Sequence, residues 1–365
     1  MLAPRICSEK TVEDDGWCTL LLRCDAGVAI GTGHAMRCLA LAQACQDAGR
    51  HPVFAMALVT PAVAERLLSE RMMVVSVESQ PGSHEDATCL AELASQRAAG
   101  WVVVDGYHFD ADYQRALRAA GLQILLIDDE GRADHYAADL ILNQNAHADA
   151  SLYPNREPST RLLLGSRYVL IRREFERWRE WKREIPVLGR RILVTMGGSD
   201  PDNLTARAIE ALMQTKVEGL EAIAVVGGSN PHLDSLQRLA AECGKSVRLL
   251  KDPSNMPDLM AWADLALIAA GGTLWELLAM GCPVLSYARN PVQARIISQL
   301  SDDGIVGALG YPQDCSQTET AASVVELANS QERRTRFSRL ARERIDGYGA
   351  QRVFELLAAR RVGQL

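Results

Sequence analysis

Short apolar segments rich in valine, isoleucine and leucine alternate along the chain with longer segments whose apolar residues recur at helical spacing. Short buried strands that alternate with helices are typical of parallel sheets built from βαβ units. A first series of predicted strands covers Thr19–Arg23, Met72–Val77, Trp101–Val104, Ile124–Ile127 and Leu140–Leu142, and a second covers Ile192–Thr195, Ala222–Val226, Val247–Leu250, Leu265–Ile268 and Val284–Tyr287. The pattern predicts an α/β protein with two successive sheets.

The boundary between the two series lies near residue 186. A charged segment, Arg172–Glu184, is predicted to be helical, and the proline and glycine of residues 185–189 would end that helix. We therefore expect one domain over residues 17–185 and a second over residues 186–365. Residues 1–16 lack periodicity and carry four acidic side chains, so we expect a flexible extension there.

Composition narrows the range of partners. The 365 residues are 48% hydrophobic and 23% charged, as in ordinary globular proteins, and the net charge of −7 argues against nucleic-acid binding. No apolar run approaches the roughly 18 residues that span a bilayer, so we expect a cytoplasmic protein without stable membrane insertion. The nine cysteines include no C-x-x-C pair and the seven histidines show no ligand spacing, so we expect reduced thiols, no metal and no cofactor.

Polar residues directly follow several of the predicted strands. They are Asp105-Gly106-Tyr107, Asp128-Asp129, Asn143-Gln144-Asn145 and Gly197-Gly198-Ser199-Asp200. In open α/β sheets the ligand crevice lies beyond the carboxyl ends of the strands. These clusters are therefore candidates for a binding site.

The most informative segment joins the first predicted strand to a helix. It contains Asp25, the glycine-rich turn Gly31-Thr32-Gly33, and then His34 at the helix start. Such a turn lets backbone N–H groups approach an anion, although a tight strand–helix turn explains the glycines equally well. A histidine at the mouth of the crevice can exchange a proton near neutral pH, so we favour a catalytic role for His34 over a place in the core.

Two glycine-rich turns in the second half are candidate sites for a diphosphate or a sugar. Gly197-Gly198-Ser199 follows a strand, and Asp200 with Pro201 is predicted to start a helix whose N–H groups bind an anion. Gly271-Gly272-Thr273 follows another strand and leads to Glu276. That carboxylate either accepts hydrogen bonds from a ribose or completes a T-x-x-E capping box, and the pattern leaves both open.

Two further patterns are interpreted as structural. Asp110-Ala111-Asp112 has the D-x-D form of a metal–diphosphate clamp, but we assign it to a solvated helix start. Phe175, Trp178 and Trp181 have the spacing of side chains that pack along a helix, and we prefer this to a sugar-binding platform.

Together these segments resemble the UDP-2,4-diacetamido-2,4,6-trideoxy-β-L-altropyranose hydrolase family of pseudaminic acid biosynthesis, a relative of the spore-coat polysaccharide proteins and the lipid II N-acetylglucosaminyl transferase. The resemblance covers roughly residues 19–310, and its most specific part runs from Arg23 to Ala42. It implies a GT-B fold, with two Rossmann-like domains facing across a cleft. It also implies metal-independent hydrolysis of the anomeric C–O bond of a UDP-linked deoxy-diacetamido sugar.

The resemblance further implies residue roles, with His34 as the base. The sugar is expected largely on the N-terminal domain, and UDP on the C-terminal domain, with uracil near Asn255 and Met256 and ribose on Glu276. The substrate-binding residues are then Asp25, Gly31, Gly33, Asp105, Asn145, Gly198, Ser199, Asn255, Met256, Gly272, Thr273, Glu276 and Gln293.

Two features leave alternatives open. Tyr107 is a candidate for positioning the attacking water or the sugar, but Asp105 and Tyr107 fit strand-end packing equally well. Where the family has an adjacent Asn-Gln pair, this sequence has Asn290-Pro291-Val292-Gln293, so the exact sugar stays undetermined.

Three rival functions share the same pattern. A GT-B glycosyltransferase passes the sugar to an acceptor, a UDP-sugar epimerase rearranges it, and a non-catalytic protein only binds the nucleotide-sugar. All of them share the expected small-molecule UDP-sugar ligand, and the sequence identifies no partner protein.

Overall fold

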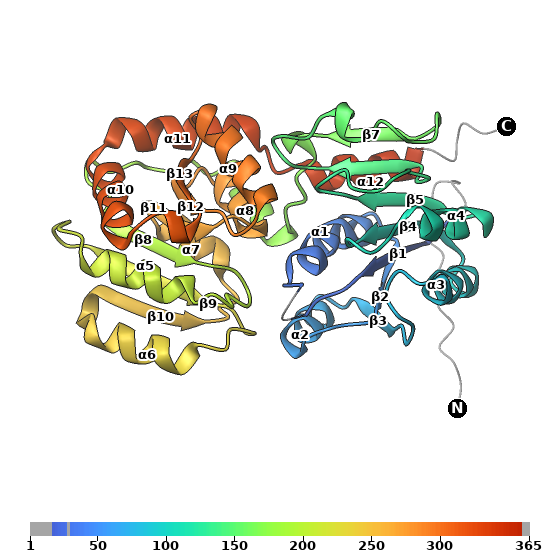
Figure 1. The fold of residues 1–365 in the computed structure, drawn as a ribbon, viewed down its shortest axis with the longest axis horizontal. Coiled ribbons are helices and arrows are strands. Elements are labelled where there is room, and N and C mark those ends of the chain that lie inside the picture. The colour runs from blue at the N-terminus through green and yellow to red at the C-terminus, as the bar shows by residue number, and fades with distance from the viewer. Residues whose placement is uncertain (1–16, 28–29, 360–365) are drawn as a thin grey trace.

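The apolar runs of the sequence form strands that are buried along their length. All residues of β1 (Thr19–Cys24) and β11 (Leu265–Ala269) are buried, as expected for parallel strands covered by helices on both faces. The computed structural model describes residues 17–27 and 30–359, which form two α/β halves side by side (Figure 1). The extension expected over residues 1–16 lies outside the described residues.

The first half is built on a seven-stranded parallel sheet with the strand order β3-β2-β1-β4-β5-β6-β7. Its further strands are β2 (His51–Met56), β3 (Met73–Ser76), β4 (Ala99–Asp105), β5 (Gln123–Ile127), β6 (Leu140–Asn143) and β7 (Arg161–Leu164). Its helices are α1 (Gly33–Asp47), α2 (Pro61–Ser69), α3 (His84–Gln96) and α4 (Ala111–Ala119).

The second half is built on a six-stranded parallel sheet with the strand order β10-β9-β8-β11-β12-β13. Its further strands are β8 (Arg191–Thr195), β9 (Glu221–Val226), β10 (Val247–Lys251), β12 (Val284–Tyr287) and β13 (Gly307–Gly310). Its helices are α5 (Leu204–Met213), α6 (Leu233–Glu242), α7 (Met256–Trp262), α8 (Gly272–Ala279), α9 (Pro291–Asp302), α10 (Gln317–Asn329) and α11 (Gln331–Arg344).

This architecture confirms the predicted fold class of two parallel-sheet α/β domains. Every predicted strand is present, while β2, β7 and β13 are additional to the prediction. Pro52 lies in β2 and glycines bound β13, and both residue types ordinarily argue against a strand. Within residues 17–27 and 30–359, the helices are too short or too polar to cross a bilayer.

The predicted helix over Arg172–Glu184 is wrong. A 3₁₀ helix covers only 173–178, and the chain beyond it is irregular. Arginines hold this connecting segment to both halves: Arg173 Nη2 donates to Glu70 Oε2 at 3.0 Å, and Arg183 Nη2 donates to the Met260 carbonyl at 2.7 Å. These tertiary contacts override the local helical pattern.

The aromatic residues of the connecting segment pack, as the sequence predicts, although not along a helix. Phe175 is buried in the core of the second half. The rings of Trp178 and Trp181 meet edge to face with their centroids 5.1 Å apart. Packing therefore explains this cluster.

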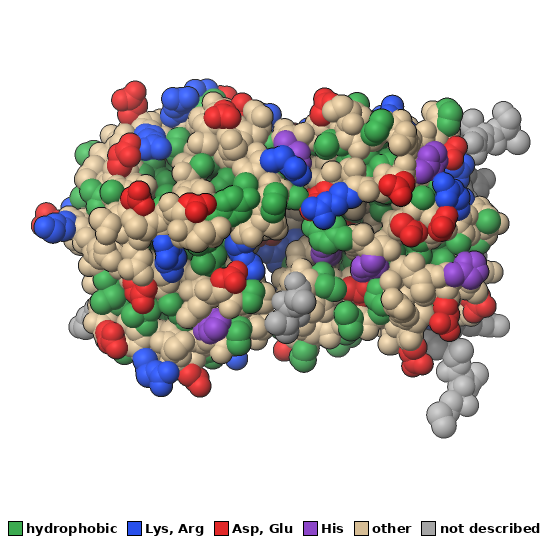
Figure 2. Space-filling model, in the orientation of Figure 1, with side chains coloured by type: hydrophobic (Ala, Val, Ile, Leu, Met, Phe, Trp, Pro, Cys, Tyr) green, Lys and Arg blue, Asp and Glu red, His purple; other side chains and the backbone are tan. Residues whose placement is uncertain are grey.

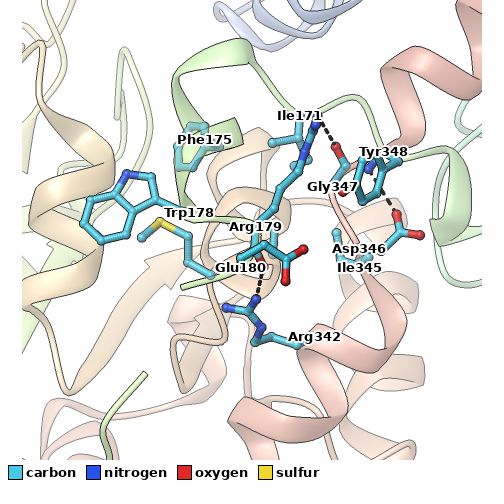
Figure 3. Close-up of a pocket in the computed structure, with 12 residues that line it drawn as sticks. Ile171, Phe175, Trp178, Arg179, Glu180, Arg342, Ile345, Asp346, Gly347 and Tyr348 are labelled. Atoms are coloured by element: carbon cyan, nitrogen blue, oxygen red, sulfur yellow. Dashed lines mark hydrogen bonds between the residues drawn. The ribbon is translucent and has the colours of Figure 1, made fainter. Parts of the chain in front are cut away.

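The chain crosses between the halves a second time near Gly347, beside the first crossing (Figure 3). Arg179 Nη2 donates to the Gly347 carbonyl at 3.0 Å, and the guanidinium lies 4.2 Å from the centre of the Tyr348 ring. Arg342 donates to the carbonyl oxygens of Arg179 and Trp181. The two crossings are thus fastened to each other.

The last helix, α12 (Gly349–Ala359), packs on the first half, although the predicted boundary assigns it to the second domain. Val353, Phe354 and Leu357 join the core that includes β1 and α1. Trp101 Nε1 donates to the Leu357 carbonyl at 2.9 Å. The end of the chain therefore completes the first domain.

Replacing Leu357 with alanine removes a fully buried side chain from this core. We expect the free energy of unfolding to fall by about 2–5 kcal/mol, the usual cost of such a truncation. Urea denaturation followed by tryptophan fluorescence measures the change. Glu355→Ala, on the exposed side of α12, is the control and should stay within about 0.5 kcal/mol. Equal stability of the two variants would contradict the packing of α12.

Candidate functional site

The strand order brings two candidate loops of the first half together. β1 and β4 are neighbours, and Cys24 at the end of β1 is paired with Asp105 at the end of β4. The order of strands reverses direction between β1 and β4, which marks the switch point where open α/β sheets bind ligands. Because α1 begins at Gly33, His34 stands at this point.

His34 and Asp105 form a close buried pair. His34 Nδ1 lies 2.5 Å from Asp105 Oδ1, and the two residues are 7% and 1% exposed. An ionised carboxylate can only accept a hydrogen bond, so this contact favours a proton on Nδ1 and leaves a lone pair on Nε2. The geometry therefore suits His34 to take a proton from a hydroxyl group or a water molecule.

Arg37 keeps Asp105 ionised. Its Nε donates to Asp105 Oδ2 and its Nη2 donates to Oδ1, both at 2.6 Å. Burial alone would raise the pKa of Asp105, but the charge of Arg37 and the contact with His34 outweigh it and hold the pKa well below its usual range. Asp105 is therefore an acceptor for the histidine ring.

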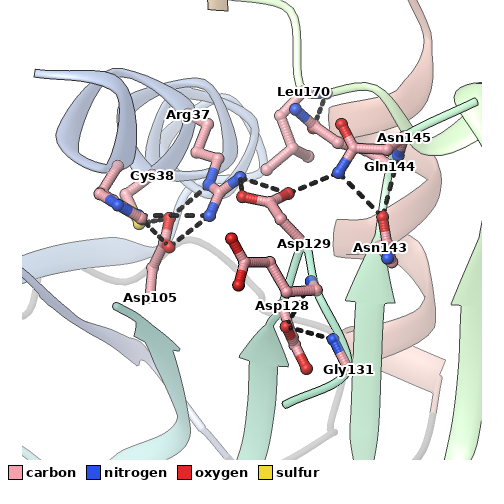
Figure 4. Close-up of polar contacts among 12 residues, drawn as sticks. Arg37, Cys38, Asp105, Asp128, Asp129, Gly131, Asn143, Gln144, Asn145 and Leu170 are labelled. Carbon is pink, nitrogen blue, oxygen red and sulfur yellow. Dashed lines mark hydrogen bonds and ion pairs between the residues drawn. The ribbon is translucent and has the colours of Figure 1, made fainter. Parts of the chain in front are cut away.

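The network continues from Arg37 to the ends of β5 and β6 (Figure 4). Arg37 Nη1 donates to the two carboxylate oxygens of Asp129 at 2.8 and 3.0 Å. Asn145 Nδ2 donates to Asp129 Oδ1 at 2.6 Å and to Asn143 Oδ1 at 3.0 Å. Asn145, a predicted site residue, is thus joined to the histidine pair through Asp129 and Arg37.

Tyr107 is the exposed neighbour of this pair. Its ring meets His34 edge-on, with centroids 5.2 Å apart and planes at 84°, and it is 66% exposed. A pocket beside the two rings is lined by residues that include Phe109, Ile127, Glu130 and Arg132. Tyr107 is therefore placed to contact a ligand that enters beside His34.

The other predicted residues of the glycine-rich loop shape the backbone. Asp25 is buried, and its Oδ1 accepts hydrogen bonds from the N–H groups of Ala57 and Leu58 at 2.7 and 2.9 Å. Through these contacts Asp25 holds two loops together, and its expected contact with substrate stays a prediction. Gly31 has φ +80°, the left-handed region that favours glycine, and Gly33 is the exposed first residue of α1.

The glycine-rich turns of the second half also lie at a switch point, because β8 and β11 are neighbours. Gly271 precedes α8 without any side chain capping the helix, and both Gly271 and Gly272 are exposed. The N–H groups of the first turn, including that of Thr273, therefore face no competing side-chain cap and suit an anion.

The helix predicted to start at Asp200 begins later, at Leu204, so Pro201 lies outside it. Asp200 Oδ1 accepts from the Leu204 N–H at 2.8 Å, and Oδ2 accepts from the Thr205 N–H at 2.9 Å. The Asp200 carboxylate therefore binds the N–H groups at the start of α5, which the sequence analysis expected to bind an anion. Only the preceding turn, with Gly198 and the buried Ser199, stays a candidate for ligand binding.

The glycine-rich turns of the two halves meet across the domain boundary. A Cβ atom at Gly198 would lie only 2.9 Å from Thr32 Oγ1 of the first half. Because Thr32 directly precedes the helix that carries His34, the histidine lies close to the second half. The space-filling view shows a hollow between the halves, with Lys and Arg side chains beside it (Figure 2).

Glu276 does not form the predicted alternative of a capping box, since no side chain caps α8. Its Oε1 instead accepts from Arg172 Nε at 2.9 Å and lies 2.8 Å from Arg172 Nη2. Burial raises the pKa of Glu276, and the charge of Arg172 offsets only part of that effect. An ion pair between the buried Glu276 and the half-buried Arg172 therefore joins α8 to the connecting segment.

The remaining predicted residues lie at the starts of α7 and α9. Asn255 precedes α7 and Met256 begins it. Gln293 Oε1 accepts from the Arg289 N–H at 2.8 Å, while Asn290 Oδ1 accepts from the Gln293 N–H at 2.9 Å. Asn290, which is not adjacent to Gln293 as in the Asn-Gln pair of the family, thus caps α9.

The structure adds Arg37 and Arg172, which the sequence analysis did not single out, and it joins Asp129, one of the strand-end candidates, to the site. The three-residue spacing from His34 on a helix was the signal that could indicate Arg37. The position of Asp129 directly after a strand was the signal that indicated it. Asp110 caps α4 by accepting from the Tyr113 N–H at 3.0 Å, which confirms the helix start. In the described part of the chain, no group of three or more His, Cys, Asp or Glu residues is placed to hold a metal ion.

No protein-family model matches the chain. It is 24% identical to the uncharacterised protein MJ1062 of Methanocaldococcus jannaschii over 74% of this chain and 55% of that protein, so the match spans about half of the archaeal protein. It is also 24% identical to the spore coat polysaccharide biosynthesis protein SpsG of Bacillus subtilis, over 91% of this chain and 96% of SpsG.

Solved structures define the class of fold. MurG of Acinetobacter baumannii is similar with a TM-score of 0.61 and 18% identity, covering 93% of this chain and 99% of MurG. HepE of Anabaena in complex with UDP is similar with a TM-score of 0.61 and 14% identity, covering 94% of this chain and 100% of HepE. A putative UDP-N-acetylglucosamine 2-epimerase of Listeria monocytogenes is similar with a TM-score of 0.65 and 13% identity, covering 96% of this chain and 98% of the epimerase. The chain therefore has the two-domain GT-B fold.

Arg172 and Glu276 should be strongly coupled. Arg172→Met leaves a buried carboxylate without its partner, so we expect the free energy of unfolding to fall by about 3–5 kcal/mol. The double variant Arg172→Met/Glu276→Gln should then lose less free energy of unfolding than the two single variants lose together. A double-mutant cycle by urea denaturation measures this difference. The exposed pair Arg177 and Asp258, 2.8 Å apart, is the control, with a coupling of at most about 1 kcal/mol. Additive losses at Arg172 and Glu276 would argue against the pair.

Proposed function

We propose that this chain hydrolyses a UDP-sugar at the anomeric C–O bond without a metal ion. One observation carries the proposal: the His34–Asp105 pair lies at the switch point of the first sheet, in the loop region that contacts the Gly198 turn of the second half. Displacement of UDP needs a base for the nucleophile and fixed dipoles for the leaving group. In this proposal the first half supplies the base and the second half supplies the dipoles.

In the proposed reaction, His34 Nε2 takes a proton from a water molecule whose oxygen attacks the anomeric carbon. The bond from that carbon to the β-phosphate oxygen breaks, and its electron pair leaves with UDP. Asp105 stabilises the imidazolium, and the proton then passes from His34 to solvent. Because this is one direct displacement without a covalent intermediate, the released sugar has inverted anomeric configuration.

The leaving diphosphate is assigned to the second half. The uncapped first turn of α8, with Gly272 and Thr273, offers N–H groups that stabilise the charge developing on UDP. The turn at Gly198 and Ser199 lies beside it, because β8 and β11 are neighbours. The complex of the structurally similar HepE with UDP supports a nucleotide in this fold.

Recognition of the nucleoside is assigned to three further residues. Asn255 and Met256 hold the uracil, and Glu276 accepts hydrogen bonds from the ribose hydroxyls. The Arg172 pair occupies Oε1 of Glu276. A ribose then shares the carboxylate with Arg172 or displaces it.

The sugar is assigned to the first half, in the pocket beside His34 and Tyr107. The resemblance of Arg23–Ala42 to the UDP-sugar hydrolases of pseudaminic acid biosynthesis supports a deoxy-diacetamido sugar and a free sugar product for nonulosonic acid synthesis. Asn145 and Asp105 support the pocket through the network around Arg37, and Gln293 faces the substrate from the second half in this proposal.

A GT-B glycosyltransferase is the second candidate. Similarity to solved glycosyltransferases favours it, and the same His34–Asp105 pair can deprotonate an acceptor hydroxyl in place of water. The exposed ring of Tyr107 beside His34 leaves that side open to such an acceptor. An epimerase, as in the Listeria neighbour, would instead keep the nucleotide attached.

A nucleotide-sugar panel in excess chelator tests the proposal. With the deoxy-diacetamido sugar substrate and no acceptor, we expect UDP and a free sugar of inverted configuration. Reaction in ¹⁸O-labelled water should label the sugar and leave UDP unlabelled, as mass spectrometry of both products reports. Turnover only with an added acceptor would establish the transferase. Label in the nucleotide, or UMP with a sugar phosphate, would exclude attack at the anomeric carbon.

His34→Ala should lower turnover by about 10²–10⁴-fold, the usual contribution of a general base. The affinity for UDP, measured by calorimetry, should change little because the nucleotide is assigned to the other half. His135→Ala is the control, since this histidine is half-buried and pairs with Glu157 at 3.0 Å on the surface of the first half. Normal turnover of a folded His34→Ala protein would remove His34 from the mechanism.

A further inference from the structure

We propose that Arg37 and Asp129 are positioning residues that set the pH at which His34 accepts a proton. The inference rests on the proposed function for its catalytic meaning, but it concerns a property of the ring that does not require turnover. It extends the site from a histidine–carboxylate pair to four charged or titratable groups that act together.

The geometry gives Arg37 control over the orientation of Asp105. Arg37 follows His34 by one helical turn of α1, so both side chains lie on the same face. Its guanidinium contacts both oxygens of Asp105 at 2.6 Å, and its Nη2 lies 3.2 Å from His34 Nδ1. The carboxylate is therefore clamped in the plane that presents Oδ1 to the histidine.

The same geometry places opposing charges near the ring. Arg37 opposes a positive charge on His34, whereas Asp105 favours it. Asp129 lies behind Arg37, 2.8 Å from Nη1, and partly neutralises it. The balance among these three charges therefore decides how readily His34 becomes an imidazolium.

Other groups face this cluster and enter the balance. Tyr107 meets the His34 ring edge-on, and the Cys38 thiol donates to Asp105 Oδ2 at 3.6 Å. The wall of the pocket adds the charged or titratable residues Asp128, Glu130, Arg132 and Tyr136. Arg37 Nη2 lies 3.2 Å from His34 Nδ1, so removing Arg37 takes away a positive charge in close contact with the ring.

Asp129 is held in place from behind. It accepts from Asn145 Nδ2 at 2.6 Å, and its side chain is 13% exposed, as is that of Arg37. The network thus runs across the ends of β4, β5 and β6, which are fixed relative to one another by the sheet. Neither charge can move away from His34 without breaking several hydrogen bonds.

The test follows the titration of His34 by NMR in protein labelled at the histidine rings, with the His34 signal identified by its loss in His34→Gln. Arg37→Met removes the opposing charge and should move the midpoint of the His34 titration up by about one pH unit or more. Asp129→Asn removes the compensating charge and should move it down by a smaller amount. Arg37→Lys keeps the charge and should lie between Arg37→Met and the unchanged protein.

Matched controls come from an exposed ion pair on α4. Arg115 Nη1 and Asp112 Oδ1 lie 2.7 Å apart on exposed side chains. Arg115→Met and Asp112→Asn change the net charge as Arg37→Met and Asp129→Asn do. Each should leave the midpoint of the His34 titration within about 0.2 pH units of that of the unchanged protein. If Arg37→Met fails to fold, Arg37→Lys and Asp129→Asn still decide the matter through opposite shifts.

Opposite shifts for the variants at 37 and 129 support the inference. Unchanged midpoints, or shifts of the same sign, would overturn it and leave these residues with a purely structural role. The acid limb of kcat/KM should move with the NMR midpoint if His34 is the base. NMR shifts without any hydrolysis would preserve the inference and reject the proposed function.

Discussion

The buried carboxylate of Asp105 is the constraint on which the rest of the site depends. A charge that is 1% exposed is costly unless it is paired, and the partners of Asp105, which are His34, Arg37 and the Cys38 thiol, all come from α1. Asp105 ends β4 and α1 follows β1, so the pairing requires these strands to be neighbours. The register that opposes Cys24 to Asp105 meets this requirement. The strand order and the position of His34 are therefore consequences of one arrangement.

The connecting segment matters because it couples the two halves at the site. Arg173 binds Glu70 of the first half, while its neighbour Arg172 binds Glu276 in the second. A ligand that contacts Glu276 therefore acts directly on the segment that joins the halves. The second crossing at Gly347 and the packing of α12 on the first sheet hold the other side of this connection.

Much of this arrangement could be predicted, because strands, glycine-rich turns and strand-end polar residues leave local signals. His34 and Asp105 were both candidates, yet their direct contact depends on the order of strands in the sheet. The Arg172–Glu276 pair could not be predicted, since its members are 104 residues apart and Glu276 also fits a local capping box. The helix expected over Arg172–Glu184 failed for the same reason: long-range contacts of its arginines outweigh local preference.

In the proposed function the base and the site for the leaving group lie on different halves, and this division places the choice of reaction outside the base itself. Water and an acceptor hydroxyl make the same demand on His34, which is to remove one proton as the oxygen attacks. What differs is the space in front of Nε2. We assign the rim of that space to the ring of Tyr107, which lies edge-on beside His34, and to Thr32, which precedes the helix of His34 and approaches Gly198. A rim that admits only water makes the site a hydrolase, and one that admits a larger acceptor makes it a transferase. Under the proposed function, the selectivity between the two reactions is therefore a property of the interdomain surface rather than of the histidine–aspartate pair.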